Sequence, residues 1–291
     1  MHTPAYLEAN GSRIEYFARG TGSPVVLLHS TASSSAQWLA LTEQLCARHR
    51  VVALNLLGYG NSSNWDGRGP FRLQHETAPL DALVRELGQP AHLIGHSYGG
   101  AVALAFARTR PHLVRSLALY EPVAFHLLRG GDARDRTALA EIRRIAANVR
   151  GALRTGHYAA GARHFVDYWS GPGTWAMMPP GRRQAVVARL PKIALDFHAT
   201  LHEPAVLSDF AALRMPRMLL RGARTTVPAQ RICDALGKVW SDARQLRLEG
   251  AGHMAPLTHA PLVNALLAGF LEEQAPLAYA ARSPEERRIP A

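Results

Sequence analysis

Short apolar runs alternate with segments of helical periodicity along most of the 291 residues, and this alternation is the strongest constraint on the fold. A run such as VVLLH at 25–29 is typical of a strand covered on both faces. Strands that alternate with amphipathic helices predict the α/β class, with a mostly parallel sheet and helices on both faces. The start of the chain differs: residues 5–9 and 13–18 flank Asn10-Gly11, which predicts an antiparallel hairpin.

The alternation lapses between residues 122 and 208, where helical patterning is interrupted by Pro and Gly. A segment of this length is too long for a loop within a compact sheet. We therefore expect a helical cap at 122–208, inserted into a core formed by 1–121 and 209–274. Residues 275–291 contain SPEERRIP and predict a flexible tail.

One motif points to chemistry. Gly95-His96-Ser97-Tyr98-Gly99 has the form G-x-S-x-G, directly after the apolar run AHLI and directly before the helical run AVALAFA. Small residues around the serine permit a sharp turn from strand to helix that exposes the hydroxyl. This context predicts that Ser97 is a nucleophile; an ordinary glycine-rich turn is the alternative.

A serine hydroxyl is a poor nucleophile until a base removes its proton, so a histidine has to lie within reach. Of the 14 histidines, His253 in EGAGHMAP follows a predicted strand and precedes the last helix. This position predicts that it lies at the same end of the sheet as Ser97, in the chain order nucleophile, acid, histidine. His96 is expected to be a packing residue, and His29 to order its neighbouring loop by hydrogen bonding.

With these segments assigned, the chain resembles the α/β-hydrolase superfamily over nearly its whole length, through LLHSTASSSAQW, LNLLGYGNSS, GHSYGG and GAGHMAP. The resemblance implies the α/β-hydrolase fold and an oxyanion hole formed by the backbone amides of Tyr98 and Thr31, with Ser30 as the alternative to Thr31. The family usually has His-Gly where this chain has His29-Ser30, and Asp where it has Asn55. Both departures are tolerable because the oxyanion hole uses backbone amides.

The acid is missing from its usual position. In most relatives an Asp follows the strand that here reads RMLLRG, but residues 223–227 contain no carboxylate. Glu121 ends the strand after the nucleophile's helix, where haloalkane dehalogenases are among the members that carry their acid. We predict that Glu121 orients His253, with a capping or salt-bridging role as the alternative. Asp209 is expected to be structural, and Glu249 to point away.

Charge, apolar runs and cysteine content indicate which kinds of partner, compartment and cofactor to expect. The net charge of +11 comes from basic residues spread along the chain, so a small-molecule substrate is expected and nucleic acid is not. No apolar run is long enough to cross a bilayer, and the first 30 residues lack the pattern of a secretory signal, so we expect a cytoplasmic protein. With two isolated cysteines and no phosphate-binding glycine loop, no metal and no cofactor are expected. A homodimer is compatible with these features.

These features predict a bacterial esterase, in which Ser97 attacks a carboxylic ester of a small, largely apolar substrate and the acyl-enzyme is then hydrolysed. A carbon–carbon hydrolase of ring-cleavage diketones and a cofactor-free perhydrolase are alternatives with the same residues. A ligand-binding protein on the same fold is the alternative that is not an enzyme. The aromatic residues expected to line the pocket are Phe125, Phe165, Tyr168, Trp169, Trp175 and Phe197.

Overall fold

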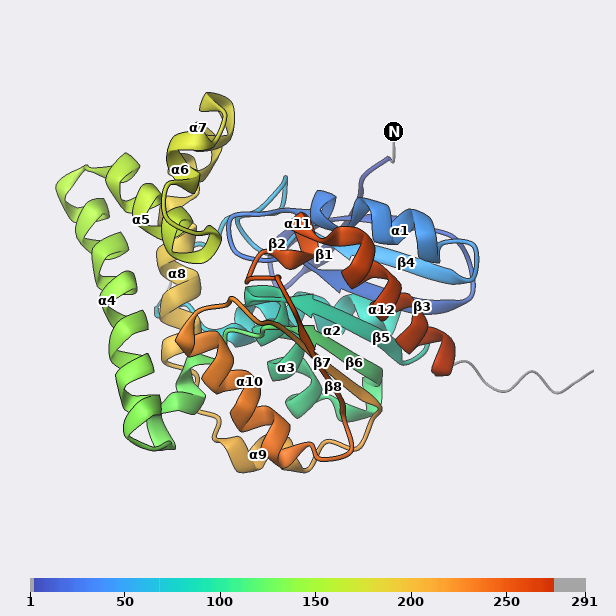
Figure 1. Cartoon of the computed structure of the whole chain (residues 1–291). Coiled ribbons are helices and arrows are strands. Elements are labelled where there is room, and N and C mark those ends of the chain that lie inside the picture. The colour runs from blue at the N-terminus through green and yellow to red at the C-terminus, as the bar shows by residue number, and fades with distance from the viewer. Residues whose placement is uncertain (1–2, 68, 275–291) are drawn as a thin grey trace, which may run out of the picture.

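The computed structural model describes residues 3–67 and 69–274, and within them eight strands form one sheet (Figure 1). The predicted tail at 275–291 lies outside the described residues. The strand order is β1-β2-β4-β3-β5-β6-β7-β8. The strands are β1 (Ala5–Ala9), β2 (Ser12–Arg19), β3 (Ser23–Leu28), β4 (His49–Leu54), β5 (Ala91–His96), β6 (Val114–Tyr120), β7 (Arg217–Gly222) and β8 (Arg244–Leu248).

The N-terminal hairpin and the parallel part of the sheet agree with the sequence pattern. β1 and β2 pair antiparallel, and the turn between them uses Asn10 and Gly11 at φ angles of 50° and 76°, which these residue types tolerate. β2 also pairs antiparallel with β4, whereas every later pair in the sheet order is parallel. The predicted mostly parallel sheet with an antiparallel hairpin is confirmed.

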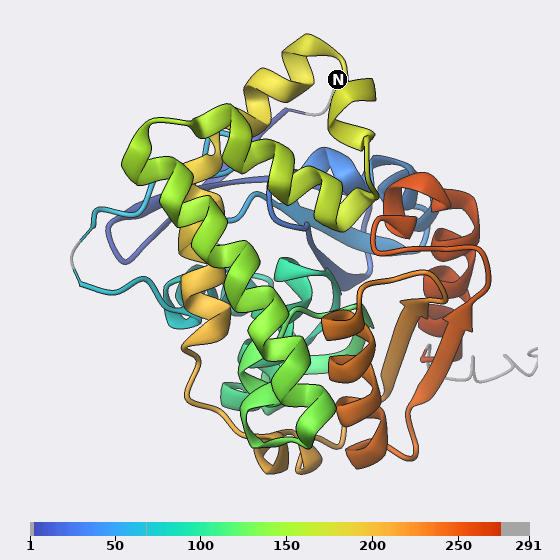
Figure 2. The ribbon, with the colours of Figure 1, turned by 60° about the vertical axis from the view of Figure 1, so that its left-hand side comes forward.

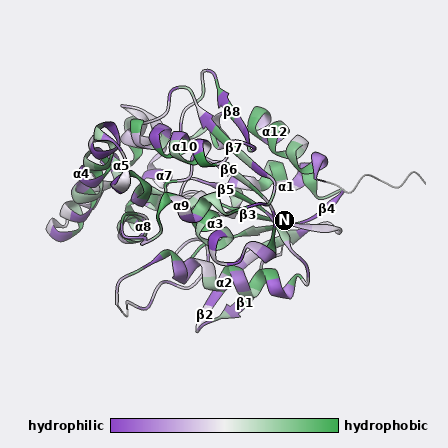
Figure 3. Ribbon diagram, turned by 90° about the horizontal axis from the view of Figure 1, so that it is seen from below, coloured by the Kyte–Doolittle hydropathy of each residue, from purple (hydrophilic) through white to green (hydrophobic). Residues whose placement is uncertain are grey.

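Successive side chains of a strand point to opposite faces of the sheet. Since apolar side chains lie on both faces, helices cover both. Val25 and Leu27 of β3 share one buried cluster with α1 and α12, whereas Val26 and Leu28 share the other with α2, α3 and α10. Figure 3 shows the hydrophobic residues concentrated on the central strands. These helices, with the shorter ones around them, are η1 (Ser35–Trp38), α1 (Leu39–Leu45), α2 (Leu73–Glu86), α3 (Tyr98–Thr109), η2 (Pro111–Leu113), η3 (Phe125–Gly130), α9 (Leu207–Ala211), α10 (Val227–Val239), α11 (Ala255–Thr258) and α12 (Ala260–Glu273).

Five further helices lie between β6 and β7 in the chain and gather at one side of the sheet (Figure 2). The longest, α4, begins after Asp132, which caps it by accepting the amide of Asp135 at 2.9 Å, and ends at Gly156 in the left-handed conformation. In the described part of the chain, no helix is both long and apolar enough to span a membrane. This helical insertion consists of α4 (Ala133–Thr155), α5 (Tyr158–Ser170), α6 (Thr174–Met177), α7 (Pro180–Ala188) and α8 (Leu190–Leu201).

Candidate active site

Ser97 occupies a sharp turn between β5 and α3. Its backbone has φ 55° and ψ −114°, a left-handed φ that costs a non-glycine residue about 1–3 kcal/mol. The flanking glycines permit this turn, since a Cβ at Gly95 would lie 2.6 Å from the carbonyl oxygen of Gly99, and one at Gly99 only 2.3 Å from that of Leu28. The predicted strand–turn–helix context is therefore present. A side chain at position 95 or 99 would disrupt the backbone from which Ser97 projects.

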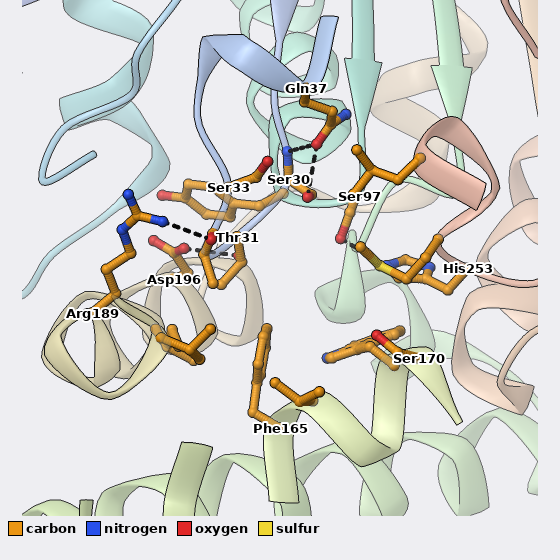
Figure 4. Close-up of a pocket in the computed structure, with 18 of the residues that line it drawn as sticks. Ser30, Thr31, Ser33, Gln37, Ser97, Phe165, Ser170, Arg189, Asp196 and His253 are labelled. Carbon is orange, nitrogen blue, oxygen red and sulfur yellow. Dashed lines mark hydrogen bonds between the residues drawn. The ribbon is translucent and has the colours of Figure 1, made fainter. Parts of the chain in front are cut away.

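Three predicted site residues meet at the carboxyl ends of the strands. His253 lies in the loop between β8 and α11, and its Nε2 is 2.9 Å from Ser97 Oγ (Figure 4). Its Nδ1 is 2.7 Å from Oε2 of Glu121, which directly follows β6. The carboxylate can only accept, so Nδ1 carries the proton and Nε2 is free to accept from the serine hydroxyl. All three side chains are buried.

Glu121 is bound by the loop in which most relatives carry their acid. Its Oε1 accepts the backbone amide of Gly222 at 2.6 Å, and its Oε2 accepts the hydroxyl of Thr225 at 2.5 Å. The residue itself has a left-handed φ of 44° and no exposed surface. With His253, these groups give the buried carboxylate three hydrogen-bond donors, so its position is determined by β7 and the loop that follows.

The backbone amides of the loop after β3 and of the start of α3 differ in whether a group of the protein already accepts their hydrogen bond. The amide of Ser30 donates to Oε1 of Gln37 at 3.1 Å (Figure 4). The amide of Thr31 has no hydrogen-bond partner among the described residues, and that of Tyr98 is in the first turn of α3, where helical amides have none within the helix. Thr31 and Tyr98 both line the pocket in front of Ser97, so these two amides are the available donors there.

A second hydrogen-bond chain supports His253 from behind. Gln37 accepts from Ser30 through Oε1, so its Nε2 donates to Nδ1 of His96 at 3.1 Å. His96 then donates from Nε2 to the backbone carbonyl of His253 at 2.9 Å. Burial, together with the nearby His253, holds the pKa of His96 well below its usual range, so its imidazole is neutral. The expectation of a packing residue was incomplete, because its polar contacts fix the loop of His253.

Other predicted residues have structural contacts. His29 donates to the carbonyl of Ser30 at 2.8 Å and accepts the amide of Leu56 at 3.2 Å, and burial lowers its pKa to about 3. It therefore orders the neighbouring loops as a neutral side chain.

Asp209 accepts a backbone amide at the start of α9, and Glu249 pairs with a neighbouring exposed arginine. Neither carboxylate contacts His253 in the structure.

The pocket in front of Ser97 is a largely apolar cavity of about 380 Å³ between the sheet and the helical insertion. Four of the six predicted aromatic residues line it. The prediction was wrong for Tyr168, which hydrogen-bonds Glu141 at 2.7 Å, and for Trp175; neither reaches the cavity. Trp169 covers the site, with its ring centroid 4.1 Å from that of His253. The lining aromatic residues are Phe125, Phe165, Trp169 and Phe197.

Potential metal ligands do not gather in the described residues, which contain no group of three or more His, Cys, Asp or Glu side chains able to hold an ion. Two arginines, Arg182 and Arg189, line the pocket.

Sequence reasoning missed Gln37 and the contact of Trp169 with His253, because both depend on pairs that are distant in the chain.

The sequence model of the family described as "alpha/beta hydrolase fold" matches residues 23–260. The chain belongs to this α/β-hydrolase family. A 2-hydroxymuconate semialdehyde hydrolase from Pseudomonas sp. (strain CF600) is 29% identical over 286 residues, which cover 91% of this chain and 92% of that protein. The crystal structure of a hydrolase from Pseudomonas aeruginosa PA01 superposes with a TM-score of 0.75 at 22% identity, covering 92% of this chain and 98% of that one.

Another relative matches part of the chain. A haloalkane dehalogenase from Sphingobium indicum is 31% identical over 123 residues, which make up 41% of this chain and 42% of the dehalogenase. The α/β-hydrolase fold predicted from the motifs is thus confirmed by the sheet and by the family match together.

Proposed function

We propose that this member of the family is a serine hydrolase that cleaves a carboxylic ester of a small, largely apolar substrate through an acyl-enzyme. The proposal depends above all on one observation, the continuous hydrogen-bond chain from Glu121 through His253 to Ser97 beneath an apolar pocket. A serine activated in this way is suited to attack on a carbonyl carbon.

In the proposed reaction, Ser97 Oγ bonds to the ester carbonyl carbon while its proton passes to Nε2 of His253. The carbonyl oxygen becomes an oxyanion, which the amides of Thr31 and Tyr98 stabilise. The C–O bond to the alcohol then breaks, and His253 returns the proton to the leaving alkoxide. A water molecule, deprotonated by His253, attacks the acyl-enzyme and releases the acid, so that Ser97 regains its proton. Glu121 holds the imidazole and stabilises its charged form throughout.

The helical insertion supports the proposed specificity. Phe165 and Trp169 of α5 and Phe197 of α8 supply much of the apolar lining. We therefore propose that residues 122–208 act as a cap that selects the substrate, over a catalytic core formed by 1–121 and 209–274. A cavity of about 380 Å³ suits short or medium acyl chains.

The test is hydrolysis of p-nitrophenyl acetate, butyrate and octanoate by the purified protein and by its Ser97→Ala variant. We expect turnover by the parent only, with the butyrate preferred to the octanoate. Equal turnover by both proteins would contradict the serine mechanism. Binding of an ester without turnover by either protein would favour the ligand-binding alternative.

A second candidate is hydrolysis of a carbon–carbon bond, favoured by the similarity to the 2-hydroxymuconate semialdehyde hydrolase along nearly its whole length. Arg182 and Arg189 among the pocket residues suit a carboxylate-bearing substrate. The experiment measures loss of the absorbance of 2-hydroxymuconate semialdehyde beside ester turnover. A kcat/KM that is higher for this compound than for every ester would replace the esterase proposal.

A further inference from the structure

Thr31 and Tyr98 share a second feature, which concerns their side chains rather than their amides. Thr31 Oγ1 donates to Asp196 at 2.8 Å, and the hydroxyl of Tyr98 donates to Glu76 at 3.2 Å. Lys192 joins these two carboxylates, since its Nζ is 2.9 Å from Glu76 and also hydrogen-bonds Asp196. Both proposed oxyanion donors are therefore attached to one buried cluster, Lys192, Glu76 and Asp196.

The buried cluster is closed to solvent, with exposed fractions of 6% for Lys192, 1% for Glu76 and 3% for Asp196. Buried charges are costly unless they are paired and hydrogen-bonded. Although burial opposes it, the two carboxylates raise the pKa of Lys192, so the ammonium group stays charged. Its Nζ also lies 4.6 to 5.0 Å from the centroids of three aromatic rings, those of Tyr59, Phe71 and Tyr98.

The buried cluster connects separate elements. Lys192 and Asp196 lie one turn apart on α8 of the helical insertion, and Glu76 lies on α2. Thr31 follows β3 and faces Asp196 (Figure 4). A second contact from the insertion holds the same loop, because Arg189 donates to the carbonyl oxygen of Ala32 at 3.0 Å. Ala32 itself has a left-handed φ of 61°, so this loop needs outside support to keep its shape.

We propose that the buried cluster is a positioning device for the oxyanion hole. It holds the hydroxyls of Thr31 and Tyr98 so that their backbone amides converge on the oxyanion. The inference rests on the proposed function, since it takes these amides as the donors. It adds Lys192, Glu76 and Asp196 as positioning residues, and it makes helix α8 of the insertion a part of the catalytic geometry as well as a pocket wall.

Two substitutions test the device without removing an amide: Thr31→Val and Tyr98→Phe each delete one hydroxyl and keep the side chain's shape. We expect kcat for p-nitrophenyl butyrate to fall about 10- to 100-fold with KM within twofold, since displacing a catalytic group by 1 Å can cost about 10²-fold. The Thr31→Val and Asp196→Asn losses should sum to less than full additivity in the double variant, because the valine removes one of the contacts that the asparagine also disturbs.

The matched control is Tyr168→Phe, which removes a tyrosine–glutamate hydrogen bond in the same insertion but outside the pocket. We expect its kcat to be unchanged. Thermal unfolding of every variant is recorded beside its kinetics. If Tyr168→Phe lost as much activity as Tyr98→Phe, or if Thr31→Val and Tyr98→Phe both stayed within threefold of the parent, the positioning role would be wrong.

A second readout does not depend on the turnover of a carboxylic ester. An alkyl fluorophosphonate reacts when Ser97 Oγ bonds to phosphorus, the P–F bond breaks, fluoride leaves and the serine proton passes to His253; its phosphoryl oxygen needs the same amides. The labelling rates should fall as kcat does. Labelling of Ser97 without ester turnover would overturn the ester proposal while the labelling rates still decide on the buried cluster. No labelling of Ser97 in the parent would overturn both.

Discussion

Replacement of Glu121 by Gln tests the proposal that Glu121 is the acid that orients His253, because it removes the charge and nearly preserves the shape. Nδ1 of His253 lies 2.7 Å from Oε2 of Glu121. At an effective dielectric constant of about 20, this separation corresponds to about 6 kcal/mol between a carboxylate and an imidazolium. Since each 1.4 kcal/mol is about a tenfold change in rate, complete loss of the interaction would lower kcat about 10⁴-fold.

The hydrogen bonds of Glu121 also predict that the Glu121→Gln variant loses activity. The carboxylate accepts from Gly222, Thr225 and His253, but a glutamine has one acceptor oxygen and an NH₂ group that only donates. If the NH₂ faces Gly222, two donors meet without an acceptor. If it faces His253, the imidazole has to move its proton to Nε2, which can then no longer accept from Ser97.

The assay is kcat for p-nitrophenyl butyrate, measured for Glu121→Gln and for Thr225→Val. The valine variant loses the 2.5 Å hydrogen bond to the carboxylate but keeps the charge, so its kcat should fall only about tenfold, the scale of one charged hydrogen bond. Unfolding curves show whether either variant retains its fold. A Glu121→Gln enzyme within fivefold of the parent, alongside an inactive Ser97→Ala enzyme, would refute the assignment.

Three further predictions concern geometry and pH. Glu121→Asp shortens the side chain by one methylene and should lower kcat about 10²-fold with little change in KM, which steady-state kinetics on p-nitrophenyl butyrate measures. Gln37→Leu leaves Nδ1 of the buried His96 without its donor, so urea unfolding should show a loss of about 1–3 kcal/mol, whereas an unchanged midpoint would contradict the contact. Burial lowers the pKa of His92 to about 4 from an ordinary value near 6.5, so the unfolded chain binds this proton first as the pH falls. The free energy of unfolding should therefore drop by about 2 kcal/mol for this residue between pH 7 and pH 5, and His92→Gln should show a correspondingly smaller drop in the same urea titration.

The sheet and the sharp turn at Ser97 could be predicted from the sequence because both depend on local signals. Apolar runs and turn residues specify strands, and the glycines around Ser97 are required by atoms that lie next to it in space. His253 was predictable from its position after the last strand. Glu121 was predicted from the family resemblance, because it directly follows β6, where haloalkane dehalogenases are among the members that carry their acid, and because residues 223–227 contain no carboxylate.

The contacts that complete the site could not be predicted, since they join residues remote in the chain. Gln37 and His96 are 59 positions apart, and Lys192 and Glu76 are 116 apart. Neither pair belongs to a motif of fixed spacing. Lysine and glutamate occur mostly on surfaces, so composition indicates solvent rather than a buried cluster. Only the contacts that α8 makes with Glu76 of α2 and with Thr31 in the loop after β3 bring these charges together.

The proposed position of the acid has a structural explanation. β6 lies between β5, which leads to Ser97, and β7, which leads to the loop that usually carries an Asp. From the end of β6, the longer glutamate side chain contacts His253 and is held by the amide of Gly222 at the end of β7. The end of β7 and the loop after it thus supply donors, Gly222 and Thr225, in place of the acid. In the proposed triad the carboxylate lies one strand away from its usual position, so a missing Asp in the sequence does not by itself indicate a missing triad.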